Sequence, residues 1–238
     1  MSKMLFFPQS VPDFHVALSL SLVIFGFDGV NLDVLLAKSK NPLHEGKLFL
    51  PSRNLAAEDD LSETAIEMFQ NLFGHKTPNL IEQLKAFGAV DRSPGGRVVN
   101  IAHNALVKSS DFKAEKWEQH GMHWCPVEKI PELNFDHNEI VQFARDRLAR
   151  RVRRRPLGFY MLPTEFTLGQ LKRLYEKALS TKIDKRNFRK KLFKTDLLED
   201  LCRKADGKAY GQHKGSILYK FNMKAYQDMD LQGYHFQF

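Results

Sequence analysis

A run of cations with one amide among them occupies residues 184–194, DKRNFRKKLFK. Arg186, Lys190 and Lys194 are four residues apart and would lie on one side of a helix, while Phe188 and Leu192 form an apolar seam. Arginine can bond the guanine edge, asparagine can pair with adenine, and lysines neutralise phosphates. The segment is therefore typical of a helix that enters the major groove of DNA. The candidate contact residues are Lys185, Arg186, Asn187, Arg189, Lys190 and Lys194.

The surrounding charge points the same way. Residues 145–220 hold 22 Lys/Arg and 8 Asp/Glu, whereas the rest of the chain holds 14 and 20. A strongly basic third joined to an acidic remainder suggests that the basic part meets a polyanion. A solubilising surface, or a scaffold that contacts an acidic partner protein, is the alternative. RNA is less favoured, because the segment has no aromatic stacking platform of the RNA-recognition type.

The elements around this helix predict a small DNA-binding domain. Residues 168–180 carry apolar side chains at helical spacing, with Thr167 as the N-cap. The stretch KAYGQHKGSILYKFN (208–222) reads as a β-hairpin whose tip presents His213 and Lys214 to DNA. Helix, tight connection, helix and hairpin is the order of a winged helix-turn-helix. We assign it to residues 156–238.

Residues 1–155 read as a separate α+β domain. Strands are predicted at 16–27 and 32–39 around the turn Asp28-Gly29, then at 84–90 and 97–107. A helix at 59–74 begins with a capping box from Asp60 to Glu63 and stops at Gly74. A long helix at 136–155 is expected to begin with a second capping box, from Asp136 to Glu139.

Composition narrows the functional classes. A chain of 238 residues suits two unequal domains, and its two cysteines lack metal-ligand spacing, which favours a reducing compartment and no metal site. The apolar run 16–27 is shorter than the roughly 18 residues of a membrane span. We expect a cytoplasmic protein without a membrane partner and without a cofactor.

Several motifs together resemble the Nudix-related transcriptional regulators, the NrtR-like family. They are FTLGQLKRLYEKAL, DKRNFRKKLFKTDLLE and HKGSILYKFN in the second domain, with FGAVDRSPGGRVVNIAHNAL and FDHNEIVQFARDRL upstream. DKRNFRK and LYKFN place the chain closest to the sugar-responsive branch typified by arabinose regulators. The resemblance implies a Nudix-type α/β/α sandwich with a mixed sheet, a homodimer and a double-stranded operator.

The resemblance also locates a Nudix box. Active hydrolases carry Gly, five residues, Glu, seven residues, Arg-Glu, an apolar residue, any residue, Glu-Glu, any residue and Gly. With the last Gly on Gly74, the first Gly falls on Arg53 and the first Glu on Asp59. The other carboxylate positions fall on Met68, Asn71 and Leu72, none of which suits Mg²⁺. We therefore expect a sensor of a small effector such as a sugar, a sugar phosphate or ADP-ribose, and no enzyme.

The rival hypothesis is a hydrolase of ADP-ribose or nucleoside diphosphates that uses Glu58, Asp59 and Asp60 as metal ligands.

The polar groups expected near the effector of a sensor belong to the loop DRSPGGR and its neighbours. The candidate effector-binding residues are Arg53, Phe87, Asp91, Arg92, Arg97 and Asn100.

Overall fold

A mixed β-sheet forms the centre of the first domain. The computed structural model describes residues 16–39, 46–108, 117, 121–156, 158–208 and 211–231. The main strand order is β3-β2-β1-β6-β5, with β4 paired to β1 and β7 to β2. Strands β1 and β6 are parallel and the other pairs antiparallel. The strands are β1 Ala17–Phe27, β2 Leu32–Lys38, β3 Leu48–Phe49, β4 Ser52–Asn54, β5 Leu80–Phe87, β6 Val98–Val107 and β7 Met122–Pro126.

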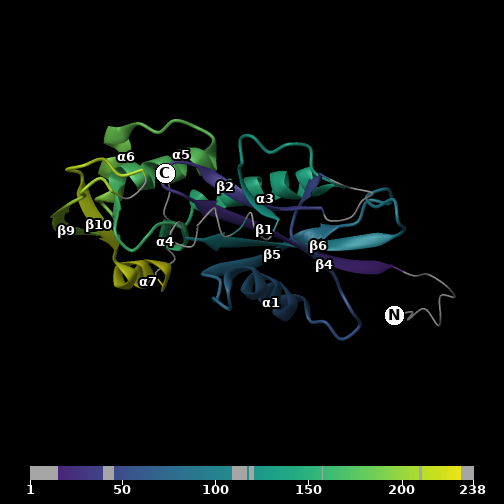
Figure 1. Cartoon of the computed structure of the whole chain (residues 1–238). Coiled ribbons are helices and arrows are strands. Elements are labelled where there is room, and N and C mark those ends of the chain that lie inside the picture. Colours follow the sequence, from purple (N-terminus) through teal and green to yellow (C-terminus); the bar gives the residue numbers. More distant parts are fainter. Residues whose placement is uncertain are drawn as a thin grey trace, which may run out of the picture.

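Helices α1 (Leu61–Phe73) and α3 (His137–Val152) cover opposite faces of this sheet (Figure 1). Successive residues of β1 point to opposite faces. Leu20 and Leu22 accordingly pack in the apolar cluster that contains α1. Phe25 and Phe27 pack in the cluster that contains α3. The predicted α/β/α sandwich is confirmed.

The second domain is a winged helix. Its helices are α4 (Gly158–Met161), α5 (Leu168–Leu179), α6 (Lys185–Leu192) and α7 (Met223–Leu231). A three-stranded sheet has the order β8-β10-β9, from β8 (Phe166–Thr167), β10 (Ile217–Phe221) and β9 (Leu198–Lys204). Thr167 caps α5 and forms a full capping box with Gln170. Figure 1 shows α5, α6, β9 and β10 gathered at one end of the molecule.

One apolar cluster runs through both domains. It contains Ile140 and Leu148 of α3, Phe166 of β8, and Leu171 and Tyr175 of α5. The core therefore continues across the expected boundary at residue 155. In the described part of the chain, no helix combines the length and the apolar character needed to cross a bilayer.

The expected capping box at Asp136 is wrong. Asp136 is the N-cap residue of α3, but its side chain makes no cap hydrogen bond. Its carboxylate instead accepts two hydrogen bonds from Arg92. A bidentate bond to a guanidinium is stronger than a bond to a backbone N–H, so the distant partner prevails. At α1, Asp60 accepts from the backbone N–H groups of Ser62 and Glu63, which is the Asp60 half of the predicted capping box.

The predicted hairpin begins too late in the chain. Its first strand is β9 at 198–204, and the pairing extends to a hydrogen bond from the Ala205 N–H to the Ser216 carbonyl, 2.7 Å. Lys208 and residues 211–214 therefore lie in the loop between β9 and β10, which we call the wing loop. Gly207 and Gly215 have φ of 80° and 81°, a left-handed conformation that glycine adopts readily and that interrupts a strand. The predicted return strand is confirmed as β10.

Two helix ends also fall earlier than expected. Helix α6 ends at Leu192, so Lys194 lies in the following turn and not on the helix. Helix α3 ends at Val152, and residues 153–155 continue as turns.

Candidate nucleic-acid interface and effector site

The basic face of α6 is fully available to a partner. Phe188 and Leu192 are buried at 3% exposure each, and Phe188 packs edge-on against Tyr175 with ring centroids 5.7 Å apart. The Asp184 side chain caps the helix by accepting from the Asn187 N–H at 2.8 Å. All the polar side chains of α6 are exposed. They are Lys185, Arg186, Asn187, Arg189, Lys190 and Lys191.

A groove of about 280 Å³ separates α6 from the wing. Lys185 and Arg189 line its helix side and His213 lines its wing side, so the structure brings together three of the predicted contact residues. Lys172 of α5 and Tyr219 of β10 also line it and were not predicted. Their positions depend on how α5 and the wing pack, which no local pattern reveals. Lys214 and Lys194 are exposed nearby in sequence but do not line this groove.

The wing also touches the first domain. The Arg173 Nε atom donates to the Gly29 carbonyl at 3.0 Å, and its Nη2 atom donates to the Gly211 carbonyl. A Cβ at Gly211 would stand only 2.4 Å from that Gly29 oxygen. Lys177 of the same helix pairs with Glu128 at 2.9 Å. Helix α5 thus connects the β1–β2 turn to the wing, and sequence reasoning missed this contact.

Near that contact lies a carboxyl group with an unusual pKa. Asp33 of β2 is 7% exposed, and its burial, together with the nearby Asp28 charge, raises its pKa to about 6. The Lys177 charge opposes this shift. The charge of Asp33 therefore changes near pH 6, close to the contact between the two domains.

Arg53 of β4 is linked by ion pairs to residues in and just before α1. Its guanidinium donates to Glu67 at 2.7 Å and to Asp59 at 3.0 Å, and the Glu67 bond followed by the Asp59 charge raises the pKa of Arg53. Met68 and Leu72 are partly buried against the apolar cluster between α1 and the sheet. Arg53 thus pairs with the Asp59 carboxylate, which the hydrolase hypothesis requires as a metal ligand. The described residues contain no group of three His, Cys, Asp or Glu placed to hold a metal ion.

The other expected effector residues do not form one site. Asp91 and Arg92 line a hollow of about 420 Å³ between the β5–β6 connection and the start of α3. Arg97 lies close by and donates to the carbonyls of Gly88 and Ala89 at 2.7 and 3.1 Å. Arg53, by contrast, binds residues of the α1 side. The structure therefore groups Asp91, Arg92 and Arg97 and separates Arg53 from them.

Phe87 and Asn100 are internal residues. Phe87 is 4% exposed and stacks edge-on with Phe143 of α3 at 5.9 Å. The Asn100 amide donates to the hydroxyls of Ser19 and Ser21 at 2.9 and 2.8 Å across the β1–β6 pair. Both side chains are held inside the sandwich.

His137 begins α3 as a buried acceptor. Its Nδ1 atom accepts from the Leu50 N–H at 3.0 Å, so this nitrogen is unprotonated. Burial lowers its pKa to about 4. The histidine therefore joins the helix start to the sheet as a neutral group.

Comparison with known proteins agrees with this two-part architecture. Residues 158–221 match the family described as the NrtR DNA-binding winged helix domain. A curated relative is the ADPR responsive transcriptional repressor NtrR of Acinetobacter baylyi. It is 29% identical over 217 residues, which cover 88% of this chain and 83% of the relative.

Solved structures show the same fold over most of the chain. Shewanella oneidensis NrtR complexed with a 27mer DNA gives a TM-score of 0.74 at 24% identity, covering 92% of this chain and 97% of that one. A MutT/nudix family protein from Enterococcus faecalis gives a TM-score of 0.66 at 20% identity, covering 88% and 89%. The chain thus pairs a Nudix-like fold with a winged helix, and the winged helix is the part that matches the NrtR DNA-binding family model.

Proposed function

We propose that this protein is a transcriptional repressor that binds duplex DNA through α6 and the wing. The observation that carries the proposal is the uniformly exposed basic face of α6, anchored by Phe188 and Leu192 and flanked by the groove that Arg189 and His213 line. A helix of this form suits the major groove, and the wing suits the adjacent backbone. The repressor role follows the curated relative.

The operator arrangement rests on the expected homodimer. Two winged helices would read half-sites whose centres lie about one helical turn apart. With three or four phosphate contacts in each half-site, the logarithm of affinity should fall with the logarithm of salt with a slope of roughly −5 to −7.

The Nudix-like domain is proposed to bind the effector without cleaving it. Arg53 holds the Asp59 carboxylate, Asp60 caps α1, and Met68 and Leu72 pack against the core. Asp59 and Asp60 are thus engaged within the protein, and Met68 and Leu72 offer no oxygen for the octahedral site that Mg²⁺ requires. ADP-ribose is the first effector to test, because the curated relative is ADPR responsive. A sugar or sugar phosphate remains the prediction of the sequence motifs.

The effector would act by favouring one arrangement of the two domains. A ligand shifts an equilibrium only by the difference between its affinities for the two states. The contact from Gly29 through Arg173 to Gly211 is a physical link of the required kind, because it joins the first domain to the wing. Through Arg173, a movement of the β1–β2 turn would be passed to the wing.

The test is selection from a random duplex library at about 0.15 M salt, physiological ionic strength. A palindromic motif is expected, and ADP-ribose is expected to release the selected duplex. Arg186→Ala should weaken the selected site by about 1–3 kcal/mol and relax the preference at one base pair. Lys129→Ala, which removes an exposed cation of the first domain, is the control. Recovery of no motif would refute sequence-specific binding, and Mg²⁺-dependent turnover of ADP-ribose would favour the hydrolase alternative.

A further inference from the structure

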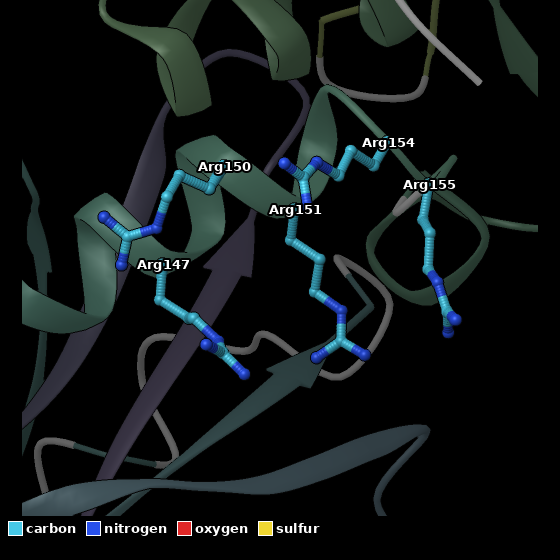
Figure 2. Close-up of a pocket in the computed structure, with 5 residues that line it drawn as sticks. All are labelled: Arg147, Arg150, Arg151, Arg154 and Arg155. Atoms are coloured by element: carbon cyan, nitrogen blue, oxygen red, sulfur yellow. The ribbon is translucent and has the colours of Figure 1, made fainter. Parts of the chain in front are cut away.

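Five arginines surround a hollow of about 270 Å³ at the carboxyl end of α3. Arg147, Arg150 and Arg151 belong to the helix, and Arg154 and Arg155 to the turn after it. The turn is held by the N–H groups of Arg154 and Arg155, which both donate to the Arg151 carbonyl at 2.9 Å. Figure 2 shows the side chains of Arg147, Arg151 and Arg155 extending to the same side. We call this hollow the arginine pocket.

The arginine pocket holds more positive charge than its neighbours balance. Glu82 of β5 pairs with Arg151. Arg147, Arg150 and Arg154 have no acidic partner among the residues that the structure describes. Burial, and the charge of Arg155, lower the pKa of Arg151. A cation at a helix carboxyl end is ordinarily favourable, but the like charges of Arg147, Arg150 and Arg154 around one hollow repel each other.

We propose that the arginine pocket binds phosphate groups. The planar guanidinium fork matches phosphate oxygens in a bidentate way, and several forks around a concave space suit a group that carries more than one negative charge. An anion seated there would relieve the repulsion between the unpaired arginines. A single carboxylate would leave most of it in place.

The arginine pocket is distinct from the sites described above. It shares no lining residue with the groove beside α6 or with the hollow at Asp91 and Arg92. It lies where the chain leaves the sandwich and enters α4. The phosphates can come from a soluble diphosphate compound or from a DNA backbone, and both present the same chemistry to the guanidinium groups.

The first experiment uses inorganic pyrophosphate as the probe and isothermal titration calorimetry on the full chain. Arg154→Gln removes a lining cation, and Arg153→Gln removes the same charge from the adjacent exposed residue, which does not line the pocket. Saturable binding is expected for the unaltered protein and for Arg153→Gln. Arg154→Gln should bind about tenfold more weakly, as expected for the loss of a charge-assisted hydrogen bond. Equal melting temperatures of the two variants establish that both are folded.

The second experiment separates the two phosphate sources. The salt dependence of binding to a duplex is measured for the same variants. If DNA is the source, pyrophosphate does not bind, and Arg154→Gln lowers the slope by about one unit while Arg153→Gln does not. Either pattern supports the phosphate site. Equal behaviour of Arg154→Gln and Arg153→Gln in both experiments overturns it. The pyrophosphate result does not depend on operator recognition, so the two proposals fail separately.

Discussion

The ion pair between Arg92 and Asp136 should make a large contribution to stability. The Arg92 Nε and Nη2 atoms donate to the two Asp136 oxygens at 2.8 and 2.7 Å. The side chains are only 5% and 14% exposed. The pair fixes the β5–β6 connection to the start of α3. Arg92→Met keeps much of the side-chain volume and removes the cation, which leaves the Asp136 carboxylate without its partner.

The expected cost follows from burial and from the position of the carboxylate. Removing one partner of a buried pair typically costs about 3–5 kcal/mol. Asp136 retains some solvent contact and stands at the amino end of α3, where the helix dipole favours a negative charge. We therefore expect the lower end, about 3 kcal/mol, for Arg92→Met. For a chain of this length each kcal/mol lowers the melting temperature by about 2–4 °C.

A double-mutant cycle in urea measures the pair directly. Arg92→Met, Asp136→Asn and the double variant are unfolded while the fluorescence of the two tryptophans is followed. The double variant should be more stable than the sum of the single changes predicts, by about 2 kcal/mol. Arg97→Met is the matched control, because Arg97 lies in the same connection, is more exposed and donates to the backbone carbonyls of Gly88 and Ala89. Additivity within about 0.5 kcal/mol would refute the reasoning.

Three further predictions concern pH, the wing and DNA. The folded-state pKa of His137 is about 4 against 6.5 when unfolded, so the unfolded chain binds more protons between these values and stability falls as pH drops from about 6.5 to 4. The loss of unfolding free energy is about 3 kcal/mol and should be absent in His137→Gln. The raised pKa of Asp33 changes stability in the opposite direction. The quantity to measure is therefore the difference in unfolding free energy between the unaltered protein and His137→Gln at each pH. Gly211→Ala should lower the melting temperature more than Gly215→Ala, because both glycines have positive φ but only a Cβ at Gly211 meets Gly29. Equal decreases in melting temperature would mean that the wing does not contact the first domain at Gly29. Lys190→Ala should weaken binding to all duplexes alike and reduce the salt slope by about one unit per lost phosphate contact; a sequence-dependent loss would contradict a backbone role.

Much of the fold was predictable because its signals are local. The apolar run of β1, the helical spacing in α5 and the caps at Asp60 and Thr167 each depend on residues within one element. The seam of Phe188 and Leu192 on α6 has the same origin, and both residues are buried as expected. The basic face opposite this seam follows from helix geometry alone.

The candidate effector site was less predictable because its side chains bind distant partners. Arg92 was expected near an effector, and in the structure its guanidinium is engaged by Asp136, far along the chain. Asn100 and Phe87 lie inside the sandwich because neighbouring strands and α3 cover them. The chemistry of a loop side chain does not reveal which distant group will pair with it in the folded protein.

The sequence by itself determined the strands β1 and β6, the helix α5 and the chemical character of α6, because hydrophobic periodicity and charge along one element need no knowledge of the rest of the chain. Only the tertiary structure decided which charges are paired, where the wing loop begins, and that Gly211 lies against Gly29. It also decided that the arginines at the end of α3 surround one hollow. These features depend on the approach of segments far apart in the sequence, and such an approach is set by packing of the whole core.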